Sequence, residues 1–380
     1  MNSRQRLVTL EPGAIAGTLD AWRALGPGMG VMALLPEAEK AHIPMLQQVF
    51  RDSGIPLCGA VFPALITDTG FTTSGVWLVC FERMPPHLLI ADVRTDGATQ
   101  LSNVIRQLLP AGAAASPPTV FMVFDGMLPA IGTLLDDVHR ELGNSVVYTG
   151  VNAGSETFTP MSCLFDQNQC VGFGVLVLLM PADWQVVLHH GYPVSKRLMT
   201  ATSSTGNRID TIDNRPALEV YQSVIQTEYG VTLTRENFYD HAVHFPFGVV
   251  TAVDVLVRIP VAFTDDGALV CVGEVPPNTL LRLLRAPQLE DSECVLTMAQ
   301  KIDAITRGVA PPSLLTFYCA GRRMHFGDDA VEEVIQLKAA ARTPLLFGAL
   351  TLGEIDSMED LDMPRFHNAA LVCVPSVSPQ

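Results

Sequence analysis

Short apolar runs recur along this chain, and they follow the same order three times. The three sets span residues 30–61, 119–151 and 314–350. In each set a β-rich apolar run is followed by a stretch with helical spacing and then by a second β-rich run that ends near a glycine. Those glycines are Gly59, Gly150 and Gly348. This order is typical of a βαβ unit.

Each set is followed by a loop and by one more apolar run, which predicts a strand that returns to the same sheet. The returning runs lie at 75–81, 170–180 and 368–374. The repeated unit is therefore βαβ plus a returning strand. We expect an α/β fold in which these units form mixed sheets covered by helices and are arranged in two halves.

The region between the second and third sets has a different character. Residues 189–225 predict a strand, an Asn/Asp turn and then a helix that begins near Pro216, where a residue without an N–H is tolerated. Residues 249–275 predict strands that alternate across a turn at Asp265–Gly267. We place the two halves at residues 1–185 and 186–380.

Composition and charge narrow the class of protein. The chain has 380 residues, 48% of them hydrophobic and only 17% charged, and its formal charge is −15. Binding to nucleic acid or to an anionic membrane requires clustered Lys and Arg, and the densest clusters here contain two residues each. No apolar run approaches the ~20 residues that a membrane span needs, and the N-terminus lacks a signal-peptide core. We therefore expect a soluble cytoplasmic protein with no nucleic-acid or membrane partner.

The eight cysteines are scattered and contain no Cys-x-x-Cys pair. Most lie in apolar runs, as buried reduced thiols do, so we expect neither a disulfide framework nor a structural zinc site. A nucleophile elbow, a Walker loop and a dinucleotide-binding glycine motif are also missing from the sequence. The sequence therefore favours binding over catalysis.

The candidate site lies in the last sixty residues, where polar groups stand at the ends of apolar runs. Side chains from several strand ends can converge on one pocket, as they do in many α/β proteins. Glu354 follows Gly353, and a glycine there would let a ligand approach the backbone. The Glu354 carboxylate suits either a ligand contact or an internal pair with Arg322 or Arg323. The other candidates for this pocket are Cys319, Arg322 and Asn368.

Cys319 and two further candidates, His325 and His367, each allow more than one interpretation. Cys319 suits a metal or haem thiolate, a nucleophile or a buried apolar residue. His325 and His367 are predicted in loops beside the same strand ends, where they suit ligation or simple backbone hydrogen bonding. The neighbouring pair His189 and His190 is predicted to point to opposite faces of a strand, which disfavours joint chelation.

The motifs of the C-terminal half resemble those of the FIST family of bacterial sensory modules, which have an N-terminal and a C-terminal part. The resemblance rests on HHGYPVSKRLMTATSSTGNRIDTIDNRPALEVY at 189–221, FPFGVV at 245–250, CAGRRMHFG at 319–327, TLGEI at 351–355 and FHNAAL at 366–371. The N-terminal half is similar in layout only. CGAVFPALI at 58–66 lacks the Thr, Gly and Glu that the family shows there, so any site served by Glu354 is expected to be asymmetric.

The resemblance implies a ligand-sensing protein that acts on a separate partner, such as a histidine kinase or a cyclic-dinucleotide enzyme. One branch of the family binds haem and senses nitric oxide. Resemblance to this branch implies haem b as a cofactor. It also implies His367 or His325 as the ligand of the haem iron, because neutral imidazole is the usual axial ligand. A small metabolite is the other ligand that this resemblance allows. Two further functions stay open: an enzyme that uses Cys319, Glu354 or a histidine, and a scaffold that binds only protein.

Overall fold

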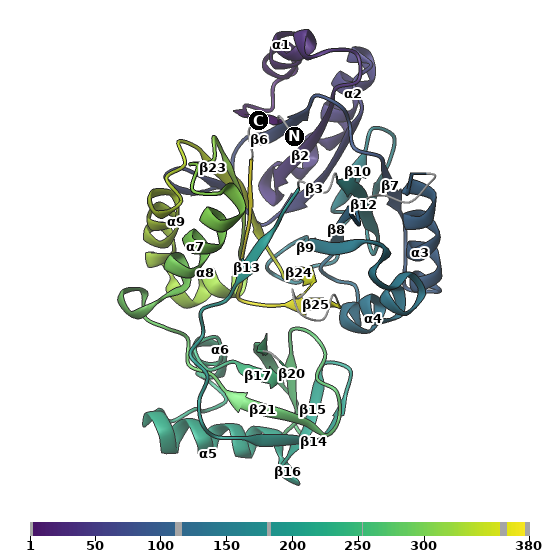
Figure 1. The fold of residues 1–380 in the computed structure, drawn as a ribbon. Helices are drawn as coiled ribbons and strands as arrows, with labels where there is room; N and C mark the ends of the chain where they lie inside the picture. Colours follow the sequence, from purple (N-terminus) through teal and green to yellow (C-terminus); the bar gives the residue numbers. More distant parts are fainter. Residues whose placement is uncertain (1–2, 111–115, 181–183, 253, 358–362, 377–380) are drawn as a thin grey trace.

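The computed structural model describes residues 3–110, 116–180, 184–252, 254–357 and 363–376 (Figure 1). Each predicted set forms two parallel strands joined by a helix, and a returning strand pairs antiparallel with the first. The elements of the first unit are β2 (Gly30–Pro36), α2 (Ile43–Ser53), β3 (Leu57–Phe62) and β6 (Val76–Phe81). Those of the second are β8 (Thr119–Asp125), α4 (Ile131–Leu142), β9 (Val147–Ala153) and β12 (Val175–Met180). Those of the third are β22 (Leu314–Cys319), α9 (Asp329–Ala340), β23 (Leu346–Thr351) and β26 (Leu371–Pro375).

Every unit also begins with a strand and a helix that the apolar runs did not reveal. The added strand lies at the edge of the unit's sheet, next to the returning strand, and the added helix packs beside the helix of the βαβ motif. The added strands are β1 (Ser3–Val8), β7 (His87–Ile90) and β13 (Val187–His189), and the helices are α1 (Pro12–Trp22), α3 (Gly97–Leu108) and α7 (Cys294–Thr306). The fold is thus a mixed α/β architecture, as predicted, and each repeat is longer than predicted.

The units exchange hairpins in a closed cycle. The hairpin of the first unit pairs with β23 of the third, that of the third pairs with β9 of the second, and that of the second pairs with β3 of the first. In chain order the hairpins are β4–β5 (Leu65–Thr67, Gly70–Thr72), β10–β11 (Leu164–Asp166, Cys170–Val171) and β24–β25 (Glu354–Ser357, Pro364–His367). The sheets therefore hold the two halves of the chain together by backbone hydrogen bonds.

The three glycines that mark the units have one physical role. A Cβ atom at Gly59, Gly150 or Gly348 would lie 2.5, 2.2 or 1.7 Å from a carbonyl oxygen of the neighbouring parallel strand. Contacts that short do not occur, so only glycine lets the two strands approach here. In each unit, this close contact lies in the second parallel strand. After that strand the polypeptide leaves the sheet of its own unit and forms a hairpin in the sheet of another unit.

The inner faces of the three sheets meet in one apolar core. Phe317 of the third unit stacks on Phe121 of the second, with ring centroids 5.8 Å apart, and lies 6.1 Å from Phe62 of the first. These aromatic rings bury large apolar areas where the units join. The helices lie on the outside of the sheets (Figure 1).

A small domain is inserted between β13 and α7 and lies below the body in Figure 1. It has its own sheet and its own apolar core. The predicted turns and the helix after Pro216 are confirmed there. Its elements are β14 (Met199–Thr205), β15 (Arg208–Ile212), β16 (Arg215–Pro216), α5 (Ala217–Tyr229), α6 (Phe238–Ala242), β17 (Phe247–Val250), β18 (Val255–Arg258), β19 (Pro260–Phe263), β20 (Leu269–Cys271) and β21 (Thr279–Leu283). Within the described ranges, no helix is both long and apolar enough to cross a membrane.

Candidate functional site

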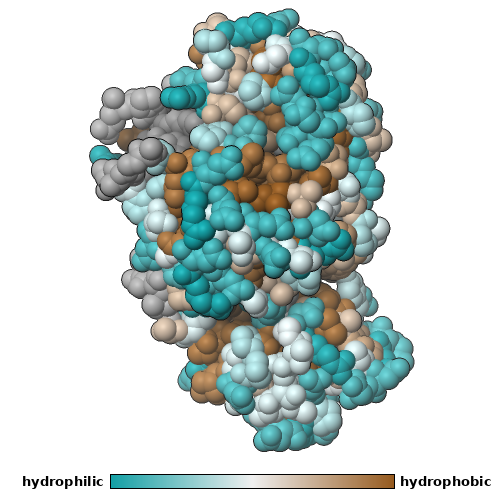
Figure 2. Space-filling view, turned by 90° about the vertical axis from the view of Figure 1, so that its right-hand side faces the viewer, coloured by the Kyte–Doolittle hydropathy of each residue, from teal (hydrophilic) through white to brown (hydrophobic). Residues whose placement is uncertain are grey.

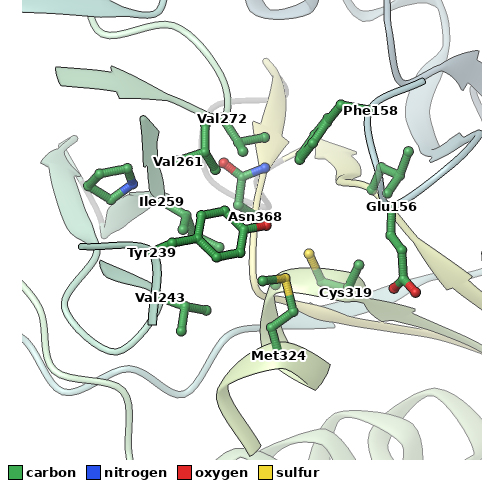
Figure 3. Close-up of a pocket in the computed structure, with 14 residues that line it drawn as sticks. Glu156, Phe158, Tyr239, Val243, Ile259, Val261, Val272, Cys319, Met324 and Asn368 are labelled. Atoms are coloured by element: carbon green, nitrogen blue, oxygen red, sulfur yellow. The ribbon is translucent and has the colours of Figure 1, made fainter. Parts of the chain in front are cut away.

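An apolar pocket opens where the inserted domain meets the body, and apolar surface gathers along this junction in Figure 2. About 40 Å³ of it is open to the centre of a water-sized sphere. Its walls come from three parts of the chain: the inserted domain, the third unit and the loop after β9 (Figure 3). The lining residues are Glu156, Phe158, Tyr239, Val243, Ile259, Pro260, Val261, Val272, Cys319, Ala320, Gly321, Met324, Leu352 and Asn368.

The floor of the pocket is the turn from β22 into the short helix α8 (Ala320–Phe326). Cys319 ends the strand, and Gly321 follows in the helix. A Cβ atom at Gly321 would lie 2.4 Å from Cδ1 of Ile259, so the missing side chain lets β19 and its flanking residues pack closely against the floor. The sequence CAGRRMHFG thus supplies both the strand end and the space that the inserted domain fills.

Three large apolar side chains lie at the mouth of the pocket although they remain partly in solvent. Phe158, Tyr239 and Met324 are 40%, 50% and 43% exposed. Phe158 also has a φ of 55°, a left-handed conformation that is rare for a bulky residue. Clustered exposed apolar groups around a cavity are typical of a binding site.

Asn368 is the one fully buried amide that lines this pocket among the described residues. Its Nδ2 donates to the carbonyl oxygen of His367 at 3.1 Å, while its Oδ1 has no partner. A carbonyl oxygen only accepts, so this contact fixes Nδ2 on the side of His367 and leaves Oδ1 as an unused acceptor. A buried acceptor without a partner costs about 1–3 kcal/mol.

Cys319 and Glu354 form a pair beneath the pocket. The Cys319 thiol donates to the Glu354 carboxylate, which also accepts from Thr351 Oγ1 at 2.6 Å and from the amide of Ala370 at 3.4 Å. Burial raises the pKa of Glu354 to about 8, although these hydrogen bonds oppose the shift. Burial also raises the pKa of the Cys319 thiol above its usual range, so both groups mainly keep their protons at neutral pH.

The position of Glu354 in the fold explains the expected asymmetry. Each hairpin begins opposite the residue that follows a glycine of the parallel strand pair: Leu65 opposite Ala349, Leu164 opposite Ala60 and Glu354 opposite Val151. The first two units thus place leucine where the third places a carboxyl group.

Arg322, which was grouped with Glu354 in the predicted pocket, lies in a separate buried network. Its Nε donates to Glu333 Oε2 at 2.7 Å, and its Nη1 donates to the carbonyl oxygens of His190 and Ala369. Arg323 forms its ion pair with Glu156 at 3.7 Å. Neither arginine is therefore the internal partner that the sequence suggested for Glu354.

Gly353 has a packing role that the sequence did not indicate. A Cβ atom there would lie 2.4 Å from the ring of Phe366, so the glycine makes room for an internal aromatic side chain. Gly353 and Glu354 are not among the pocket-lining residues, and Glu354 reaches the pocket only through Cys319.

The two predicted haem ligands lie apart from the pocket lining. His367 ends β25 and is only 6% exposed, both of its ring nitrogens lack partners, and burial lowers its pKa to about 3. His325 lies on α8, not in a loop as predicted, because the helix begins directly after Cys319. Its Nε2 donates to the carbonyl oxygen of Pro287 and its Nδ1 lies 2.7 Å from Nδ1 of His244.

His189 and His190 also differ from prediction. Their rings stack with centroids 5.6 Å apart, because β13 ends at His189 and strand alternation does not extend to His190. In the described part of the chain, no group of three or more His, Cys, Asp or Glu side chains is arranged to hold a metal ion.

The sequence predicted two of the lining residues, Cys319 and Asn368, and missed the apolar ones. Phe158, Tyr239 and Ile259 lie far apart in the chain and carry no motif, so only their convergence in the fold identifies them. The helix and strand that carry Tyr239 and Pro260 belong to the inserted domain, whose packing on the third unit cannot be inferred from periodicity.

Comparison with known families agrees with this architecture. The FIST N domain matches residues 33–215, and the FIST C domain matches residues 217–357. No curated protein matches the chain. The two matches together cover most of the chain, which therefore belongs to the FIST family, whose domains are sensory modules for small-ligand binding.

Proposed function

We propose that this protein is a cytoplasmic sensor whose small ligand binds in the apolar pocket between the inserted domain and the body. The observation that carries the proposal is the convergence of exposed apolar side chains on a buried acceptor, Asn368 Oδ1, that has no partner. The pocket joins two separately packed parts of the chain, so a bound ligand would change how firmly the inserted domain is held. We infer that this change regulates a separate signalling enzyme, such as a histidine kinase or a cyclic-dinucleotide enzyme.

Binding without catalysis is the simpler use of this site. A thiol nucleophile needs an appreciable thiolate fraction, and burial raises the pKa of Cys319 above its usual range. Burial likewise raises the pKa of Glu354, so its carboxyl group is largely protonated near neutral pH. Both groups are therefore poorly suited to react, and Cys319 serves as part of the pocket floor with Glu354 beneath it.

Haem b with nitric oxide remains a prediction, and the geometry of this pocket does not favour it. Of the residues that the structure describes, none in the lining is a histidine or a cation that could pair with the haem propionates, and both ring nitrogens of His325 already have partners. The absorption spectrum of protein expressed with ample haem tests this prediction. A Soret band that His367→Ala or His325→Ala removes would support haem; a spectrum without one would exclude it.

A neutral fluorescent dye tests the pocket itself. Nile red should bind the protein saturably, and Val261→Trp, which fills the cavity from its wall, should weaken binding at least tenfold. Leu296→Trp is the matched control, because Leu296 is 59% exposed on α7 and does not line the pocket. Equal affinity in the two variants, or no saturable binding by the natural protein, would refute the proposed site.

Regulation in trans needs a second measurement. The activity of a kinase or cyclic-dinucleotide enzyme encoded beside this protein should change when the natural protein is added. Val261→Trp should alter that change, while Leu296→Trp should reproduce the natural effect. An enzyme that responds identically to both variants would remove the pocket from signalling.

A further inference from the structure

The charges around the pocket restrict the ligands that it can take. Among the described residues, the lining contains no Lys, Arg or His, and its one acidic residue there, Glu156, lies at the mouth near Phe158 (Figure 3). An anionic group entering the pocket would lose water and meet no cation, at a cost of several kcal/mol.

Three cations beside the pocket, Arg258, Arg322 and Arg323, already have protein partners. Arg322 is bound to Glu333, and Arg323 pairs with Glu156. Arg258, buried on β18, donates to the carbonyl oxygens of Val257, Glu274 and Phe366. To pair with Arg322 or Arg323, a ligand carboxylate or phosphate would have to compete with Glu333 or Glu156.

The backbone donors at the floor are occupied as well. The amide of Ala369 donates to Cys319 Sγ at 3.1 Å, and the amides of Gly321 and Arg322 also bond this sulfur. What the pocket leaves unused is an acceptor, Asn368 Oδ1, which belongs to a side chain only 1% exposed. Figure 3 shows Asn368 extending into the space between Tyr239 and Val272.

We propose that the ligand is a mainly apolar molecule whose head is neutral or cationic and donates a hydrogen bond to Asn368 Oδ1. Alcohols, amides and protonated amines belong to this class, and carboxylates and phosphates do not. The apolar part of the ligand packs against the Val243, Val261 and Val272 side of the cavity. This inference rests on the proposed function, because it assumes that the pocket is the ligand site.

Three compounds that differ only in their heads test the proposal: 4-phenylbutan-1-ol, 4-phenylbutan-1-amine and 4-phenylbutanoate, titrated at pH 7.5. The alcohol and the ammonium ion should bind at least tenfold more tightly than the carboxylate. Equal or tighter binding of the carboxylate would overturn the ligand class. If none of the three compounds binds while Nile red still binds, the proposed ligand class is also wrong. If Nile red does not bind, the proposed pocket itself is wrong.

Variants at Asn368 test the role of the acceptor. Asn368→Leu keeps the size of the side chain. It should weaken binding of the alcohol and of the amine roughly threefold to tenfold, the value of one hydrogen bond, without changing Nile red binding. Asn368→Asp keeps an acceptor at this position and should bind the amine at least as tightly as the natural protein does. Asn103→Leu, on the exposed face of α3, is the control. Unchanged alcohol and amine affinities in Asn368→Leu would show that Oδ1 does not bind the head.

Discussion

The guanidinium of Arg322 is bound to Glu333 and not to Glu354, although Arg322 and Glu354 both border Cys319. Both side chains of the Arg322–Glu333 pair are fully buried, and Tyr318 donates to the same carboxylate at 2.6 Å. Arg322 also reaches the carbonyl oxygen of His190, just after β13. The pair therefore joins α8, α9 and the edge of the third sheet beneath the pocket, and it leaves Glu354 without a salt bridge.

Removing one partner of this pair should be far more costly than replacing both. Glu333→Ala leaves a buried guanidinium without its carboxylate and should lower the free energy of unfolding by about 3–5 kcal/mol. Arg322→Met combined with Glu333→Leu should recover most of that loss, because two apolar groups need no counter-charge. Urea unfolding of both variants measures the difference. A double variant as unstable as Glu333→Ala would show that the carbonyl contacts of Arg322 dominate.

Glu354 should make the fold less stable as pH rises. Its pKa is raised to about 8 by burial, so between about pH 4.5 and 8 the unfolded chain releases a proton that the folded chain retains. The contribution of Glu354 to stability is therefore fully present below this pH window and is lost as the pH rises through it, by on the order of 5 kcal/mol for a shift of this size. The Glu354→Gln variant has no proton to lose at this position. Its melting temperature should therefore exceed that of the natural protein by an amount that grows from pH 5 to pH 9.

The control for this pH series is Glu11→Gln, at an exposed position before α1. Its melting temperature should follow that of the natural protein at every pH. A Glu354→Gln variant whose offset stays constant with pH would mean that Glu354 is ionised in the fold.

Local pattern predicted the βαβ motif and the returning strand of each unit. It missed the first strand and helix of each unit, and it failed where the units meet. The runs that became β2, β8 and β22 are buried at every position and mainly apolar because they are covered on both faces, so they were visible as runs. The hairpins are short, and their partners are strands of another unit. Nothing in the sequence near Leu65 or Glu354 specifies β23 or β9 as the partner strand.

The same limit applies to the site. Cys319 and Asn368 were found because polar groups at strand ends are conspicuous in an apolar sequence. Arg322 and Gly353 were assigned to the ligand because their internal partners, Glu333 and Phe366, lie 11 and 13 positions away and could be identified only by folding. Residues that a structure uses for packing and residues that it uses for binding can have the same local signature.

Even substitution by alanine should destabilise the protein at the unit glycines Gly59, Gly150 and Gly348. Gly348→Ala would place Cβ 1.7 Å from the carbonyl oxygen of Thr316, so β22 and β23 must separate, and we expect a loss of more than 3 kcal/mol in the free energy of unfolding. Gly17→Ala in α1 is the matched control, because no atom lies within 4 Å of its Cβ position. It should be neutral or stabilise the protein by up to about 1 kcal/mol. Thermal unfolding of the two variants, measured side by side, distinguishes a steric requirement from a general effect of alanine.

The last prediction concerns how the inserted domain is held against the second unit. Glu274, after β20, accepts a hydrogen bond from the amide of Thr133 at 2.9 Å and another from its hydroxyl group. Thr133 lies in the first turn of α4, where Ala130 precedes the helix and offers no side-chain cap. The inserted domain thus caps a helix of the body, and the negative charge suits the positive end of the helix dipole.

Glu274→Ala should remove this cap at a cost of about 1 kcal/mol and loosen the inserted domain without unfolding either part. Hydrogen exchange at the Thr133 amide should accelerate, and exchange of the central strands β8 and β22 should not. Asp265→Ala is the control, since Asp265 is a fully exposed carboxylate of the inserted domain that pairs only within it, with Arg235. Because the same junction carries the pocket, Glu274→Ala should also weaken Nile red binding, whereas Asp265→Ala should not. Faster exchange at Thr133 with unchanged dye affinity would mean that the cap and the pocket act independently.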